Sequence, residues 1–169
     1  MRILLSGLVA AGLLSSHVAA AQTCARPADK EAFEVAGLKS QLMVTALTCN
    51  VNEKYDAFVN THRPYLVNQD KVLNAYFTRA HGRRARTQFD DYITQLANSQ
   101  SQNGLKRGTL FCAENATIFD EIAALKNGNE LPDFAAGKAL AQPVALTTCT
   151  TPEAPARPAA RTTTTSRRR

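Results

Sequence analysis

The sequence predicts an all-α fold: a single antiparallel helical bundle of about five helices stapled by two disulfides, with a disordered C-terminal tail. Three observations lead to this prediction. Apolar residues recur at three- and four-residue steps, no segment alternates long enough for a strand, and four cysteines are spread along the chain. The bundle is expected to occupy residues 22–149 of the 169.

Residues 1–21 have the features of a cleavable secretory signal peptide. Arg2 supplies a positive charge, an apolar run follows from Ile3 to Leu14, and three alanines at 19–21 form a cleavage site. This run is too short to span a bilayer, which needs roughly 20 apolar residues. We therefore expect cleavage after Ala21, a periplasmic or secreted location and no transmembrane segment.

The apolar spacing places the first helices. A helix from about 28 to 48 is expected to bury one apolar face and to carry Cys49 at its end. A short second stretch at 55–62 and a third at 66–80 flank Pro64. Because proline interrupts a helix interior, we expect Pro64 to separate the two stretches.

The later helices are predicted from the same apolar spacing. A fourth helix is expected at 89–100, and the polar, glycine-containing segment 99–108 is predicted to be the longest internal loop. A fifth helix should run from a cap at Thr109 to about Leu125. A final short helix is expected at 132–140.

The cysteines of the expected mature chain are Cys24, Cys49, Cys112 and Cys149. An even number in an exported chain of this size favours two disulfides, for which three pairings exist. We favour Cys24 with Cys149, which would join the ends of the folded part, and Cys49 with Cys112, although the sequence alone does not decide. No pair is spaced C-x-x-C and the histidines lack local partners, so no metal site and no haem are expected.

Residues 150–169 differ in composition from the rest of the chain. They contain prolines, threonines and five arginines, but no large apolar side chain. Such a segment buries too little apolar surface to offset the entropy of ordering it, so we expect it to be disordered. The tail carries +4 of the formal net charge of +6, which leaves the bundle nearly neutral. No specific nucleic-acid binding is therefore expected, only weak contact of the tail with anionic surfaces.

The densest positive cluster within the bundle surrounds the end of the third predicted helix. No acidic residue interrupts it between Asp70 and Asp90. We treat it as a candidate site for a phosphate, a carboxylate or an acidic partner surface. The alternative is a solvated junction whose arginines pair with Asp90 and Asp91. The cluster consists of Arg79, His81, Arg83, Arg84 and Arg86.

No motif for nucleophilic, metal-dependent, phosphate-binding or dinucleotide-binding catalysis occurs in the sequence. We therefore expect no catalytic residues and no cofactor, and favour a non-catalytic interaction or scaffold module that binds an envelope protein or a surface component. The alternative is a small envelope hydrolase acting on cell-wall glycan, with carboxylates such as Asp90, Asp91 or Glu114 brought together by the fold. A third interpretation is capture of a small anionic ligand near Arg83 and Arg84.

Three segments, together with the signal and the cysteines, resemble a group of small exported four-cysteine helical proteins of alphaproteobacteria. The segments are VAGLKSQLMVTALTC at 35–49, YFTRAHG at 76–82 and FDDYITQLAN at 89–98. The resemblance covers roughly 24–149 and implies no activity, although some of these proteins carry the label S-adenosyl-L-homocysteine hydrolase. That enzyme binds NAD in a Rossmann domain, which needs a strand, a glycine-rich turn and a helix. The sequence lacks this pattern, so we reject NAD-dependent hydrolase activity.

Overall fold

The computed structural model describes residues 24–138 and 140–149. This part of the chain folds into six α-helices and contains no strand, which confirms the predicted all-α fold. The predicted signal peptide and the predicted disordered tail lie outside the described residues. The helices are α1 Pro27–Cys49, α2 Asn52–His81, α3 Ala85–Arg107, α4 Leu110–Asn115, α5 Thr117–Ala123 and α6 Leu131–Gly137, with 3-10 turns η1 Gly82–Arg84 and η2 Gly128–Glu130.

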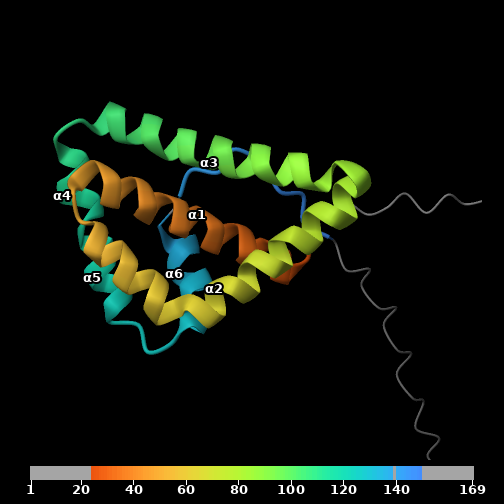
Figure 1. Ribbon diagram of the computed structural model, residues 1–169, viewed down its shortest axis with the longest axis horizontal. Coiled ribbons are helices and arrows are strands. Elements are labelled where there is room, and N and C mark those ends of the chain that lie inside the picture. The colour runs from red at the N-terminus through yellow and green to blue at the C-terminus, as the bar shows by residue number, and fades with distance from the viewer. Residues whose placement is uncertain (1–23, 139, 150–169) are drawn as a thin grey trace, which may run out of the picture.

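The first helix, α1, lies at the centre of the bundle. It crosses the molecule between α3 and α2 and also contacts α4 and α6 (Figure 1). Its buried side chains include polar Ser40, Gln41 and Thr45, so burial extends well beyond the single apolar face that the sequence predicts. A helix surrounded by neighbours in this way forms the core of the domain rather than one side of it.

The second helix, α2, runs without interruption through Pro64, so the prediction of two helices at 55–62 and 66–80 was wrong. Its two halves run in different directions around α1, with a bend near the middle (Figure 1). Pro64 explains the bend, because it lacks an N–H and its ring crowds the carbonyl one turn earlier. The helix continues because Phe58 and Leu66, on either side of the proline, are buried in one apolar cluster.

The third helix, α3, reaches Arg107, so the loop predicted at 99–108 is helix. Two contacts hold this polar segment in place. Gln100 is completely buried, and its Nε2 donates a hydrogen bond to the carbonyl oxygen of Ala141 at 3.0 Å. Gly104 lies so close to the ring of Phe111 that a Cβ at this position would be 3.3 Å from it. The helix ends at Gly108, whose φ of +55° favours glycine.

The remaining helices are short. The helix predicted from Thr109 to Leu125 is divided at Ala116 into α4 and α5. The final helix, α6, ends at Gly137 and is followed by an extended segment, 140–149. Backbone hydrogen bonds pair the end of this segment with Ala25, next to the start of α1.

Two apolar clusters form the core. An aromatic cluster near the turn between α2 and α3 is centred on Phe33, whose ring lies 5.0 Å from those of Tyr76 and Tyr92. We call this region the aromatic end. A second, mixed cluster of mostly aliphatic residues with Phe58 and Phe119 joins α1 and the first half of α2 to α5 and α6. We call the region with α4, α5 and α6 the short-helix end.

Both favoured disulfides are confirmed. Cys24 pairs with Cys149 at a Cα–Cα distance of 4.9 Å, and Cys49 pairs with Cys112 at 5.6 Å. In the chain-entropy model, closing loops of these lengths contributes about 4–5 kcal/mol each to the free energy of unfolding. Two such bonds indicate folding in an oxidising compartment outside the cytoplasm. Within the described part of the chain, every helix is too short or too polar to cross a membrane.

Candidate functional site

The predicted arginine cluster does not form one anion site, because its first member has a structural partner. Arg79 Nη2 lies 2.6 Å from Asp29 Oδ2, and this carboxylate belongs to a residue that is only 4% exposed. The same oxygen accepts a hydrogen bond from the backbone N–H of Arg26 at 2.7 Å. Arg79 therefore balances a buried charge at the start of α1 and joins α2 to α1.

The rest of the cluster is spread over the turn between α2 and α3. Arg86 pairs on the surface with Asp90 at 3.2 Å, in line with the alternative interpretation of the cluster. The His81 ring stacks on Phe77, with 5.7 Å between ring centroids. Arg83 and Arg84 are exposed and make no ion pair within the described residues. This turn therefore offers two exposed cations that have no ion-pair partner among the described residues.

The carboxylates considered for a hydrolase are not brought together. Asp90 and Asp91 are exposed near the start of α3. Glu114 lies beyond the other end of this helix, where its Oε2 accepts from Arg107 Nε at 2.8 Å and its Oε1 from Nη2. The sixteen residue-to-residue steps from Asp91 to Arg107 span about 24 Å of helix. Glu114 is therefore too far from Asp90 and Asp91 to face a common substrate with either of them.

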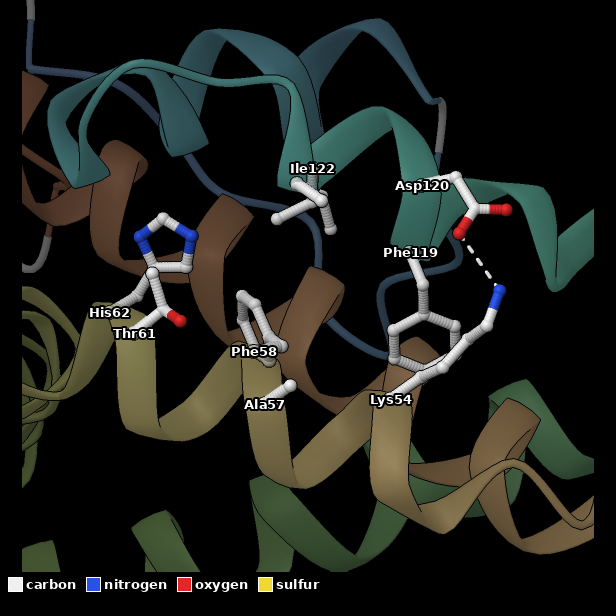
Figure 2. A pocket seen from close by; sticks show the side chains of 9 residues that line it. Lys54, Ala57, Phe58, Thr61, His62, Phe119, Asp120 and Ile122 are labelled. Atoms are coloured by element: carbon white, nitrogen blue, oxygen red, sulfur yellow. Dashed lines mark hydrogen bonds and ion pairs between the residues drawn. The ribbon is translucent and has the colours of Figure 1, made fainter.

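A concave surface is found instead between the first half of α2 and α5. Figure 2 shows this α2–α5 groove from close by. Its volume is about 160 Å³. Its floor is apolar, formed by the almost completely buried Phe58, Phe119 and Ile122. At one end, Lys54 Nζ donates to Asp120 Oδ1 at 2.8 Å, which links the two walls.

The groove continues past His62 into a second hollow of about 360 Å³. Both hollows share lining residues from α2 and α5, including His62 and Ile122, so they form one surface. The loop after α5 closes the far end, where a Cβ on Gly128 would lie 2.8 Å from Cβ of Tyr65. From Lys54 to Tyr65 the groove follows α2 for about 17 Å.

His62 is the titratable group at the middle of this surface. Figure 2 shows its ring projecting from α2 toward α5, and the residue is only 7% exposed. The ring packs beside Phe58 at 5.5 Å between centroids. Burial lowers the pKa of His62, so the ring is neutral at neutral pH. Neutral imidazole keeps the groove free of uncompensated charge at its centre.

The sequence analysis gave His62 no functional role, because the histidines lack local partners for a metal site. The signal for its position is its spacing of four residues from both Phe58 and Leu66, which places all three on the buried side of α2. The groove itself has no sequence signal, because α5 packs against α2 from far along the chain. Within the described residues, no cluster of His, Cys, Asp and Glu is suited to hold a metal ion.

Comparison with known proteins adds no family or activity to this description. No family model, no curated protein and no solved structure matches the chain.

Proposed function

We propose that the protein is an exported, non-catalytic binding module whose α2–α5 groove receives an apolar segment of another extracytoplasmic protein. The observation that carries this proposal is the groove itself, a continuous surface about 17 Å long with an apolar floor and a neutral histidine at its centre. Apolar grooves between helices are a common way to bind a partner's helix or extended segment.

The charges on the rim of the groove indicate which charge the partner segment should carry. Lys54 is already paired with Asp120, whereas Lys126 at the other end has no acidic partner in the part of the chain that the structure describes. A segment with bulky apolar side chains and a carboxylate near Lys126 would complement both the floor and the rim. The expected partner is thus an apolar peptide segment with an acidic residue at one end.

Export through a signal peptide belongs to the same proposal. Cleavage after Ala21 would release a chain that begins shortly before Cys24, in a periplasmic or secreted location. Two disulfides support this location, because they form and persist in oxidising compartments. N-terminal sequencing of the protein purified from its native source should begin at Gln22. A chain that retains Met1 would contradict the proposed export route.

Peptide selection tests the groove directly. Random peptides displayed on phage are selected against the oxidised wild-type protein, and the enriched peptides are then measured by isothermal titration calorimetry. Ala57→Arg and Ala123→Arg each place a long charged side chain at exposed positions of the groove wall. Matched controls are Ala75→Arg and Ala113→Arg, which alter exposed alanines outside it.

The enriched peptides are expected to carry apolar residues and an acidic residue. Both groove variants should weaken their binding roughly tenfold or more, and both controls should bind as the wild type does. Equal binding by groove and control variants would contradict the proposal. So would a selection that enriches no peptide.

A further inference from the structure

The turn between α2 and α3 forms the tip of the aromatic end (Figure 1). It carries Arg83 and Arg84, which are exposed and have no ion-pair partner among the described residues. Arg86 follows within one helical turn, and although it pairs with Asp90, its side chain is 89% exposed. The guanidinium groups of these three arginines are therefore all accessible from solvent.

The start of α1 brings a further cation to the same tip. Arg26 is exposed and forms no ion pair within residues 24–138 and 140–149. Its backbone N–H donates to Asp29 Oδ2 at 2.7 Å, and this oxygen lies 2.6 Å from Arg79 Nη2. Because Arg79 precedes Arg83 by only four residues, Arg26 and the turn are neighbours in space.

The described chain also leaves the bundle at this end. Cys149 is bonded to Cys24, and its backbone N–H donates to the carbonyl oxygen of Ala25 at 2.9 Å. Ala25 directly precedes Arg26. Residues 150–169, which follow Cys149 and lie outside the described residues, contain five arginines and a single acidic residue. Covalent connection alone attaches these arginines to the end that already carries the exposed cations.

The acidic residues near this end do not cancel its positive charge. Both Asp29 and Asp90 are already paired with arginines. Three further acidic residues lie on the adjoining helical turns, namely Glu31, Glu34 and Asp91. Four exposed cations without ion-pair partners in the described structure outnumber them, before the five arginines of 150–169 are counted. We call these four the cationic tip: Arg26, Lys30, Arg83 and Arg84.

A partner for the cationic tip must carry many negative charges. An ion pair between exposed groups gains little in water, so a single phosphate ion would bind weakly here. A bilayer with anionic head groups contacts several cations at once, and each Lys or Arg close to such a surface raises the affinity about fivefold. The two disulfides indicate an oxidising compartment outside the cytoplasm, where membrane surfaces are accessible and nucleic acid is scarce.

We propose that the cationic tip, together with the arginines of 150–169, binds the surface of an anionic phospholipid bilayer. The contact is peripheral and electrostatic, with guanidinium groups paired to lipid phosphates. The α2–α5 groove lies toward the opposite end of the bundle, so a protein held in this way leaves the groove open to its partner (Figure 1). The proposal does not depend on the groove, and either can fail while the other holds.

The experiment is co-sedimentation of the full oxidised protein with lipid vesicles. Vesicles of phosphatidylcholine alone measure any binding that does not depend on charge, and vesicles that also contain phosphatidylglycerol supply anionic head groups. The protein should bind the anionic vesicles at least about tenfold more tightly, and about 1 M salt should abolish the difference because the Debye length falls to about 3 Å.

Three results of this experiment would overturn the proposal. The first is equal binding to both kinds of vesicle. The second is binding to anionic vesicles that salt does not weaken. The third is tighter binding to polygalacturonate than to anionic vesicles at equal concentrations of negative charge, because the partner would then be an acidic polysaccharide.

Two double variants locate the contact. Arg83→Gln with Arg84→Gln removes two charges from the tip, whereas Lys106→Gln with Lys126→Gln removes two exposed charges near the other end of the bundle. Both double variants have the same net charge. The first should weaken binding to anionic vesicles about tenfold or more, and the second less than about twofold. Equal weakening would overturn the proposal, because net charge alone would then govern binding.

A further variant tests the contribution of the tail. It replaces all five tail arginines by glutamine, at Arg157, Arg161, Arg167, Arg168 and Arg169. Binding to anionic vesicles should weaken about tenfold or more, and unchanged binding would overturn the joint role of tip and tail. Circular dichroism should show wild-type helix content in every variant, because the substituted positions are exposed or lie outside the described residues.

Discussion

The two ends of the bundle are built differently. At the aromatic end, long helices pack along much of their length, and the rings of Phe33, Phe77 and Tyr92 fill the space between them at centroid distances of 5.0–5.9 Å. At the short-helix end, α4, α5 and α6 have only six or seven residues each. Helices this short are not stable alone and depend on tertiary contacts and on the Cys49–Cys112 bond.

This difference helps to explain where the α2–α5 groove lies. Short helices meet their neighbours over one or two turns, so α5 leaves a hollow along α2 that side chains do not fill. Hollows are not confined to this end, because another lies between the long helices α1, α2 and α3 and is lined by residues such as Met43, Tyr55 and Ile93. The groove for which we propose a binding role nevertheless belongs to the short-helix end.

The largest expected effect is on the free energy of unfolding, and it is measured by removing one phenylalanine ring from each end of the bundle. Phe33→Ala removes the ring at the centre of the aromatic cluster and should lower the free energy of unfolding by about 4–5 kcal/mol. Phe119→Ala should cost only about 3 kcal/mol, because the adjacent groove admits water and lets the site relax. Urea denaturation of both variants measures the difference. Equal losses would show that the two ends are packed equally well.

The second effect concerns the disulfide at the short-helix end. Replacing both Cys49 and Cys112 by serine should lower the free energy of unfolding by about 4 kcal/mol, because the unfolded chain regains the entropy of a long loop. Any population that remains folded should bind groove peptides more weakly than the wild type. Matched denaturation curves and peptide titrations would check both points, and unchanged peptide affinity would show that α5 does not need this bond.

A third effect is the pH dependence contributed by His62. Burial lowers its pKa in the folded state below the unfolded value of about 6.5, so the unfolded chain binds more protons between these two values. The contribution of His62 to stability is therefore complete above about pH 6.5 and is lost as the pH falls through the lowered pKa. His62→Gln should show a weaker loss of stability than the wild type between pH 7 and pH 5 in urea denaturation. Parallel pH profiles would contradict the burial of a neutral ring.

The smallest effect is expected at the turn of the aromatic end. Arg83→Ala and Arg84→Ala remove exposed side chains without ion-pair partners in the described structure, so each should change the free energy of unfolding by less than about 0.5 kcal/mol. Arg79→Ala is the matched comparison, because it leaves the buried Asp29 without its cation and should cost about 3 kcal/mol or more. Similar small losses in all three variants would show that the Arg79–Asp29 pair adds nothing to stability.

Local sequence rules predicted the all-α fold, the first helix and, as the favoured one of three possible pairings, both disulfides. The fold class and the first helix depend on periodicity, which the sequence displays directly, whereas cysteine positions only favoured one pairing and the structure was needed to confirm it. The rules failed at Pro64 and at Gly104, where helices continue because residues on either side pack against distant segments. The α2–α5 groove was missed for the same reason. His62 acquires its surroundings from α5, and no local pattern describes those contacts.

Hydrogen exchange monitored by mass spectrometry tests the difference between the two ends most directly. Amides of α4, α5 and α6 should exchange through local opening at a lower free energy than those of α1 and the second half of α2, which should exchange only on global unfolding. Adding a groove-selected peptide should raise protection in α5 and in the first half of α2. Equal protection of both ends without peptide, or peptide-dependent protection around Phe33 and Tyr92, would contradict the account.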